Sequence, residues 1–429
     1  MTTFTFKKHY LTFSLFLSII VPPVGIFLVL FIGWFHLHKA WKKGVKVKVT
    51  PGLFLLGCMF VSTICASIAM NNYSYFLVSA LILAYLGLYL KIANNPLKVF
   101  RSFKYVVILG GVYFYGIYPF QQWMMEMPVL SYFTGATLIG TVGIDPQQYT
   151  RLIGSTYNPN FSVALLLLGL SFLFADCLKS LEKGTYTKFS IQLAAVCMFS
   201  HAILLTGSKA GFVTMLILFV FFLLKWNKWI SGALITLMIL NIPLITNVMP
   251  RSDELFVSAE VRKEIWRNSF SLWQQHSLFG VTPIGFYDGY FSRFSEHVPH
   301  AHNMILGVFT EYGALGGIAL LIILFINGYK ILYLALSVKN KKIYFDHFLL
   351  SLPVVFLTGV FDYVLYSPQV AVMMLTLLAC WDQYTAKVSF TSVNLVQLKT
   401  KVMNLSLYKS RKQRTTSWEK ANSKQVSKR

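Results

Sequence analysis

Basic side chains that could bind an anion recur in the longest polar stretch of the chain, between Pro250 and Asn303. The stretch contains Arg251, Arg262, Lys263, Arg267 and Arg293. The planar fork of arginine binds phosphate oxygens through two hydrogen bonds, whereas lysine offers a point charge. Arg262 and Trp266 are four residues apart, as are Lys263 and Arg267, so each pair would share a helix face. This pattern predicts a phosphate-binding surface with Arg262 and Arg267 as the best candidates.

A histidine at the end of this stretch could act as a general base. His302 lies in the segment HAHN (300–303), directly before a long apolar run, and imidazole titrates near neutral pH. A capping or packing role is the alternative, and His297 and His300 compete for the same function. His300 and His302 could also begin a metal site, but no third ligand follows at a suitable spacing. We therefore predict no metal site.

Two further segments place polar residues directly before apolar runs. Lys209 lies in GSKAG (207–211), a turn bounded by glycines. It either snorkels from a helix end or holds its charge against an anionic lipid head. RLIGSTYNPN (151–160) presents Arg151 and Asn160, with an ordinary loop and helix start as the alternative. Glu311 and Asp362 fall within apolar runs and should face the protein interior.

The composition is that of a membrane protein. The chain has 429 residues, of which 56% are hydrophobic and 12% charged, whereas soluble domains carry about 25% charged residues. The net charge of +23 lies in short connections and in the C-terminal tail rather than on one module, which argues against nucleic-acid binding. The five cysteines form no CxxC pair, so neither a disulfide framework nor a zinc site is predicted.

The apolar runs predict an all-α polytopic fold with about 11–12 transmembrane helices. The higher number applies if Pro22 and Pro23 split the first run (10–38) into a hairpin. Lysines flank this run on both sides and favour the split, because an even number of crossings returns both flanks to the cytoplasm. We expect a transmembrane domain of residues 1–386 and a basic cytoplasmic tail, disordered, at 387–429.

Two long connections fall on the outer side, at about 121–160 and 248–302. Their cations oppose the usual placement of positive charge, so we expect them to bind a ligand rather than to set orientation. In the second loop, Val261, Ile265 and Leu272 fall on one helical face, next to a face of aromatic residues. This spacing predicts an amphipathic helix at the membrane–water interface, with docking without chemistry as the alternative.

Read together, several segments resemble the O-antigen ligase and polysaccharide polymerase superfamily. In order, they are GSTYNPN (154–160), TGSKAG (206–211), VRKEIWRNSFSLWQQHSLFGV (261–281) and HAHNMILGVFTEYGALGG (300–317). The family pattern is a Gly-Asn-Pro-Asn stretch, a Ser-Arg-Gly turn, an Arg-x-x-x-Trp helix and an Ala-His-Asn segment. Each segment is short, and the resemblance rests on their common order over roughly 150–320.

The resemblance implies a GT-C-like membrane glycosyltransferase whose donor is an undecaprenyl-diphosphate-linked oligosaccharide, without a cofactor or a required metal. In this family, outward arginines hold the diphosphate and a histidine activates the acceptor hydroxyl. Arg262 matches the helix arginine, His302 the base, and Lys209 the turn arginine, a departure that keeps the charge and loses the fork. Further diphosphate ligands and supporting residues are then expected among Arg151, Arg267, Asn160, Asn303, Glu311 and Trp266.

Three functions remain open. A polymerase would join lipid-linked repeat units into an O-antigen, capsule or exopolysaccharide on the outer face of the bacterial cytoplasmic membrane. We favour it because the lysine-, asparagine- and aromatic-rich composition suggests a bacterium without a lipid core to glycosylate. A ligase would move the finished glycan onto a lipid or wall acceptor. A flippase would need ionisable residues at mid-span depth in both halves, and these are sparse. A chain-length regulator or a flippase is the expected protein partner.

Overall fold

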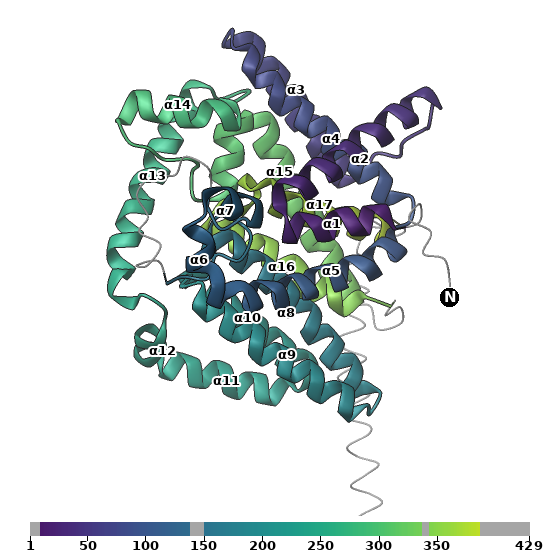
Figure 1. Ribbon diagram of the computed structural model, residues 1–429, viewed down its shortest axis with the longest axis vertical. Coiled ribbons are helices and arrows are strands. Elements are labelled where there is room, and N and C mark those ends of the chain that lie inside the picture. The colour runs from purple at the N-terminus through teal and green to yellow at the C-terminus, as the bar shows by residue number, and fades with distance from the viewer. Residues whose placement is uncertain (1–8, 138–149, 337–342, 387–429) are drawn as a thin grey trace, which may run out of the picture. The chain divides into compact units, whose positions relative to one another are not determined.

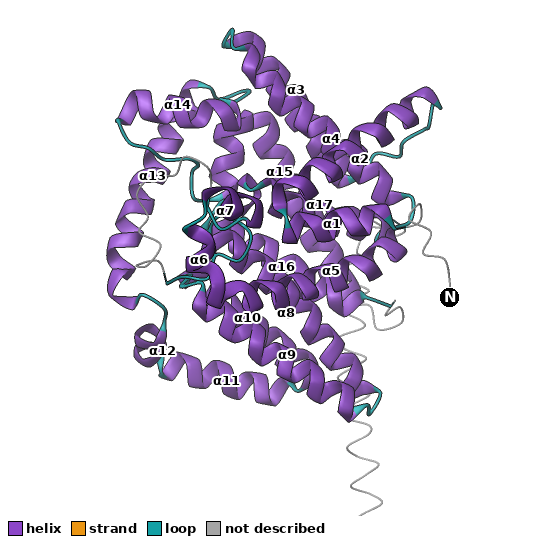
Figure 2. Cartoon of the chain, viewed as in Figure 1, coloured by secondary structure: helices purple, strands orange, loops and turns teal. Residues whose placement is uncertain are grey.

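The computed structural model describes residues 9–137, 150–336 and 343–386, and its helices lie in one compact unit, Met1–Thr385. The described residues form α-helices and short 3-10 helices and no strand (Figure 2), which confirms the all-α prediction. The basic tail predicted from residue 387 lies outside the described residues, as does part of the loop expected at 121–160.

Proline begins many of the helices. Its fixed φ suits the first helical turn, where its missing N–H would have no partner. In the N-terminal part of the chain it opens α2, α3, α5 and α7. The helices of this part are α1 (Tyr10–Ile20), α2 (Pro22–Lys42), α3 (Pro51–Ala69), α4 (Phe76–Ala93), α5 (Pro96–Ile117), α6 (Gln121–Met125) and α7 (Pro128–Thr134).

The break predicted in the first apolar run is present. α1 ends before Val21, and α2 begins at Pro22 and packs back against α1. The approach is close, because a Cβ placed on Gly25 would lie 1.9 Å from the backbone nitrogen of Ser18. With 11 residues, α1 is about 16 Å long, which is too short to cross a hydrocarbon layer of about 30 Å by itself.

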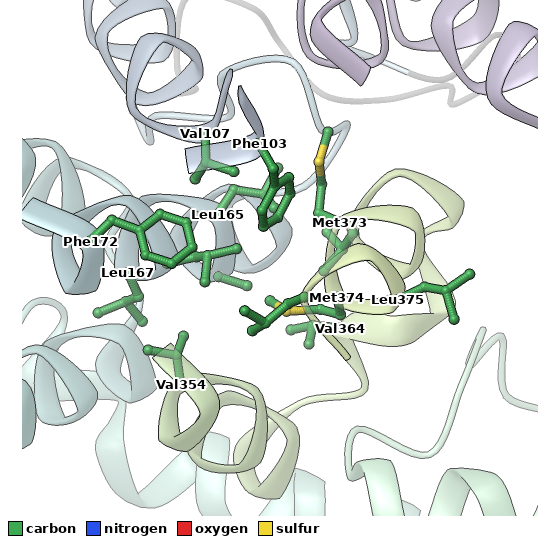
Figure 3. Close-up of a cluster of buried hydrophobic side chains, with 14 of the residues drawn as sticks. Phe103, Val107, Leu165, Leu167, Phe172, Val354, Val364, Met373, Met374 and Leu375 are labelled. Carbon is green, nitrogen blue, oxygen red and sulfur yellow. The ribbon is translucent and has the colours of Figure 1, made fainter. Parts of the chain in front are cut away.

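The centre of the fold is α8 (Pro159–Glu182), whose apolar stretch is 94% buried. It packs against α5, α9 (Tyr186–Leu205), α10 (Lys209–Trp226) and α16 (Phe345–Phe361). Figure 3 shows the resulting core, in which side chains from α5, α8, α16 and α17 (Pro368–Tyr384) interdigitate. The polar N-terminus of α8, which carries Asn158 and Asn160, is thereby held in a fixed position.

The second long connection, expected at 248–302, contains two helices rather than one. After α11 (Lys228–Leu240) and α12 (Ile242–Val248), which meet at an angle of 81°, the chain forms α13 (Leu255–Gln275) and α14 (Thr282–Phe294). These four elements follow one another along one edge of the bundle (Figure 1). The predicted helix is therefore confirmed as α13, and its Ile265 and Leu272 are buried. Val261 is exposed, and α14 was not predicted.

The helix that follows the histidines is broken in its interior. α15 (Met304–Leu336) has non-helical backbone at Gly313, with φ +62°. The loop after α13 docks at this break, where the backbone N–H of Val281 donates to Thr310 and that of Ala314 donates to Ser277. Such pairing satisfies the polar groups that a broken helix would otherwise expose inside a membrane. α13 and α14 are thus fixed to the start of α15.

Eight described helices are long and apolar enough to span a membrane, or nine if the bent pair α11–α12 forms one span. This supports a polytopic membrane protein. The number is lower than the 11–12 expected, because α1, α16 and α17 have only 11, 17 and 17 residues and α11 is interrupted at Asn241. An apolar run in the sequence therefore overstates the length of a straight helix.

Candidate active site

Three helix ends meet around His302. α8 begins beside Asp362, which Asn160 contacts, α15 begins two residues after His302, and α16 ends directly before Asp362. We call this end of the bundle the site face. The loops that join these helices bring together residues that are far apart in the sequence.

A buried carboxylate orients His302. The Nδ1 atom of His302 lies 3.0 Å from Oδ1 of Asp362, whose side chain is only 6% exposed. The same carboxylate accepts hydrogen bonds from the backbone N–H of Tyr363 (2.8 Å) and from the Asn160 side-chain amide (2.7 Å). Burial alone would raise the pKa of Asp362. The hydrogen bond from His302 and the nearby imidazoles outweigh it, so the pKa lies below its ordinary value and the group is ionised.

This contact fixes the tautomer of His302. An ionised carboxylate can only accept hydrogen bonds, so Nδ1 of His302 carries the proton. Nε2 is then left with its lone pair, and the side chain is 27% exposed, which gives a substrate access to it. A carboxylate behind a histidine performs the same task in hydrolases, where it also stabilises the imidazolium that forms. The arrangement is suited to general-base catalysis.

The two competing histidines have other positions. His300 is buried beside the pair, and its Nδ1 accepts the backbone N–H of His302 at 3.3 Å. Burial lowers the pKa of His300 to about 4, against the opposing charge of Asp362, so it is neutral at physiological pH. His297 lies apart from Asp362 and stacks on Phe291, with ring centroids 4.3 Å apart. Of the three, His302 alone has both the carboxylate contact and partial exposure.

A chain of hydrogen bonds connects the base to a cation. Arg151 donates through Nε to the carbonyl oxygen of Thr206 (2.8 Å) and through a terminal nitrogen to the amide oxygen of Asn160 (3.4 Å). Asn160 in turn donates to Asp362. The start of α8 therefore holds the guanidinium of Arg151 and the carboxylate behind His302 in one network.

Further cations surround the turn before α10. Gly207, with φ +62°, has no side chain, and a Cβ there would lie 3.1 Å from Nε of Arg151 and 3.5 Å from Cδ of Arg251. Lys209 follows this turn and donates from Nζ to Oγ of Ser258 on α13, at 3.0 Å. Arg251, one of the basic residues of the polar stretch, forms an ion pair with Glu254. The absence of a side chain at Gly207 thus lets two arginines converge.

The guanidinium of Arg262 faces this group and forms no ion pair among the described residues. It is half-buried on α13, near enough for its charge to act on Lys209, and it pairs with no residue that the structure describes. One helical turn further on, the indole N–H of Trp266 donates to the backbone carbonyl of His302 at 3.3 Å. Arg262 and the base are therefore connected through the same face of α13, as the spacing of four predicted.

Arg267 does not join the other cations. Five residues after Arg262, it points to a different side of α13, where its side chain is 77% exposed and lies 3.7 Å from Glu264. Lys263 is similarly exposed beside Glu260, and Arg293 lies over the ring of Phe294 at the end of α14. The structure therefore places Arg267 outside this group of cations, beside a glutamate, and its role as a phosphate ligand stays a prediction.

Asn303 and Glu311 have supporting positions. Asn303 caps α15 by accepting the N–H of Leu306 (3.0 Å) and donates to the carbonyl of Val360 at the end of α16 (2.9 Å). Glu311 is fully buried, and one of its oxygens accepts the hydroxyl of Tyr363, next to Asp362, at 2.8 Å. Both residues fix the loops that carry His302 and Asp362.

The structure supplies the third metal ligand that sequence spacing did not reveal. One ligand atom each of His300, His302 and Asp362 lies within 4.8 Å of the others. Nδ1 of His300 already accepts a backbone N–H, and the carboxylate of Asp362 accepts three donors. A metal ion would have to displace those bonds. The group fits a hydrogen-bonded network better than a metal centre.

Comparison with known protein families matches part of this chain. Residues 193–321 match the family model described as O-Antigen ligase. The matched segment includes Lys209, Arg262 and His302 and ends before Asp362, while Arg151 and Asn160 precede it. No curated protein matches the chain. The match supports glycosyl transfer of the ligase or polymerase type and a lipid-linked glycan substrate. It confirms the resemblance drawn from the motifs, because residues 193–321 of this membrane protein are similar to the O-antigen ligase family.

Proposed function

We propose that this protein is a metal-independent polymerase that joins undecaprenyl-diphosphate-linked repeat units into a surface polysaccharide. The observation that carries the proposal is the oriented, partly exposed side chain of His302, which Asp362 and Asn160 connect to Arg151. A base alone would suit many reactions. A base together with Arg262, Lys209 and Arg151 suits a reaction in which a diphosphate leaves.

The reaction would proceed by displacement at the donor sugar. Nε2 of His302 takes the proton of an acceptor sugar hydroxyl, whose oxygen attacks the anomeric carbon of the donor. The bond between that carbon and the diphosphate oxygen breaks, and the lipid diphosphate departs with the electron pair. Arg262 and Lys209 neutralise the charge on its oxygens, and Arg151 assists. Oriented cations at a developing anion are worth a factor of about 10²–10³ each.

We place the site on the outer side of the cytoplasmic membrane. The connections at the opposite ends of the spans carry most of the lysines, including Lys39, Lys98, Lys183 and Lys188. Positive connections stay in the cytoplasm. On this topology the donor would arrive after transfer across the membrane, which makes a flippase and a chain-length regulator its functional partners.

Two variants test the mechanism. Arg262→Ala and His302→Ala should abolish long glycan chains in cells while the protein still reaches the membrane fraction. Lys263→Ala and His297→Ala are matched controls, because each removes the same kind of side chain from the neighbourhood of the site without touching the network. Near-normal chain lengths in both test variants would remove these residues from the mechanism.

A deletion strain separates the three activities. A polymerase deletion should leave surface glycan of a single repeat unit. Loss of a ligase would leave long chains on the lipid carrier, and loss of a flippase would leave single units inside the cell. Either of the last two results would replace the proposed polymerase activity with the corresponding one.

A further inference from the structure

A second basic cavity lies at the other end of the helices. It has a volume of about 400 Å³ and is enclosed by the end of α2, the connection to α3 and the ends of α4 and α17. Five cationic or titratable side chains line it: His36, Lys39, Lys43, Lys46 and Lys48. The lining contains no carboxylate, and none of the four lysines forms an ion pair with a residue that the structure describes. The cavity therefore presents uncompensated positive charge.

The cavity is remote from His302. Tyr366, two residues before α17, lies with its ring centroid 4.9 Å from that of His300, at the site face. Gln383, near the other end of α17, lines the cavity. The segment from Pro368 to Gln383 lies within α17 and extends about 22 Å along the helix. The cavity thus faces the opposite membrane surface and cannot share a ligand head group with the active site.

An apolar strip leads along α2 to this cavity. Phe27, Phe31, Trp34 and Trp41 follow at spacings of four, three and seven, so they share one helix face, and all four are exposed. Trp41 is 82% exposed, and tryptophan is typical of the level of lipid head groups. His36, Lys39 and Lys43 lie on the neighbouring face, toward the cavity. Apolar contact along the helix and positive charge at its end match the two parts of a lipid.

We propose that this cavity binds the head group of an anionic phospholipid in the leaflet opposite to His302, with the acyl chains along the Phe27–Trp41 face of α2. The phosphate diester would lie among Lys43, Lys46 and Lys48. Asn94, whose amide lies 3.3 Å from Nε2 of His36, and Gln383 offer polar partners for a glycerol hydroxyl. This binding does not depend on the glycosyl-transfer reaction.

The alternative for these lysines is that they only mark a cytoplasmic connection. Lysines that only set the topology need not line a common cavity. Their attraction to an anionic lipid surface should depend on how many lysines are present and not on where they lie. Lysines that line the cavity can therefore be compared with lysines that lie elsewhere. Lys98, Lys183 and Lys188 are also exposed, lie at or near the ends of other helices and line no part of the cavity.

The test is lipid binding to the purified full-length protein. Phosphatidylglycerol is titrated into phosphatidylcholine–detergent micelles, and bound lipid is counted by native mass spectrometry. The triple variant Lys43→Gln, Lys46→Gln, Lys48→Gln should bind phosphatidylglycerol at least tenfold more weakly, because each lysine near an anionic lipid contributes a factor of about five. The control triple Lys98→Gln, Lys183→Gln, Lys188→Gln should change the affinity less than twofold, and the corresponding triple arginine variant at 43, 46 and 48 should retain binding.

Other outcomes overturn the proposal. Equal losses in both triple glutamine variants would show diffuse attraction, and no loss in either would show that the cavity is not the binding site. Glycerol 1-phosphate distinguishes a lipid from a soluble anion. If it competes at the same concentration as phosphatidylglycerol, the acyl chains contribute nothing and the occupant is a free phosphate ester. Melting temperatures in phosphatidylcholine alone verify that all variants are folded.

Discussion

Asn160 donates a hydrogen bond of 2.7 Å to Asp362, a residue 202 positions later in the chain, and its amide oxygen accepts one from Arg151. A single side chain at the start of the central helix α8 therefore touches both halves of the site. It contacts the carboxylate that orients His302 and a guanidinium on the side of the cations. Positioning of the base and of the leaving group thus depends on one helix end, and that helix is the most buried in the fold.

Asp362→Asn should impair turnover while leaving substrate binding nearly intact. An asparagine retains the shape but can donate as well as accept, so Nδ1 of His302 is no longer held in its protonated state. The comparable change in a serine protease triad costs about 10⁴-fold, and we expect a loss on the order of 10³-fold in kcat with little change in KM. Initial rates with purified lipid-linked repeat units measure this. Asp346→Asn, an ion-paired carboxylate at the opposite face, is the control. A rate within threefold of wild type would show that the carboxylate is not needed.

Arg262 and Arg267 form a matched pair on one helix. Arg262 is half-buried and uncommitted within the described structure, whereas Arg267 is 77% exposed beside Glu264. Arg262→Ala should lower kcat/KM by about 10²–10³-fold, as for the loss of one ligand of a developing anion. Arg267→Ala should lower it less than threefold. A comparable loss of kcat/KM in both variants would show that Arg267 also binds the diphosphate.

Lys209 tests whether a point charge suffices at the turn before α10. Lys209→Met should lower kcat/KM more than tenfold, because the charge beside Arg151 and Arg251 is lost. Lys209→Arg should retain most of the activity, since a guanidinium can also donate to Ser258 and offers a second hydrogen bond to phosphate. Steady-state rates over a range of donor concentrations measure both. An inactive arginine variant that is folded would mean that the lysine has a role other than charge.

Much of this site can be predicted from the sequence because its members precede helices. The Asn-Pro-Asn motif, the GSKAG turn and the HAHN segment each end at a helix start, and such starts have recognisable residue types. Asp362 has no such signal. It terminates α16, and its partners Asn160 and His302 are brought to it only by the packing of α8, α15 and α16. The only sign of Asp362 in the sequence is its charge within an apolar run. This predicts that the residue lies in the interior but does not predict its partners.

The arginines of α13 show a second limit of prediction from the sequence. Helical spacing correctly places Arg262 on the face of Trp266, yet it cannot tell which face of α13 turns toward the membrane domain. Arg267 was favoured by residue type, and only the neighbouring glutamates and its exposure exclude it from the cation group. Likewise, the length of an apolar run does not reveal the breaks at Asn241 and Gly313, whereas Pro22 and Pro23 did predict the one at Val21. The break at Gly313 coincides with the docking of the loop after α13.

Chelation should leave the enzyme active. His300, His302 and Asp362 could approach a metal ion, but their ligand atoms are engaged in hydrogen bonds. We expect rates in the presence of excess EDTA to remain within twofold of those without it. The decisive opposite result is a loss of activity that one particular divalent ion restores and that Asp362→Asn abolishes. It would identify the three residues as a metal centre.

His300 should give the protein a pH-dependent stability. Burial lowers its pKa from 6.5 to about 4, although Asp362 acts in the opposite direction. Between these values the unfolded chain binds a proton that the folded imidazole excludes, so stability rises with pH by up to about 1.4 kcal/mol per pH unit. Asp362, whose pKa is lowered, adds stability that is lost only at still lower pH. Thermal unfolding of the detergent-solubilised protein between pH 5 and 6.5 should therefore show a melting temperature that increases with pH.

In His300→Gln the increase of melting temperature with pH should be smaller. The matched control is His297→Gln, which removes an imidazole without contact to Asp362. An unchanged slope in His300→Gln would mean that the buried imidazole is not excluded from protonation, and the neutral state assigned to it beside the base would be wrong.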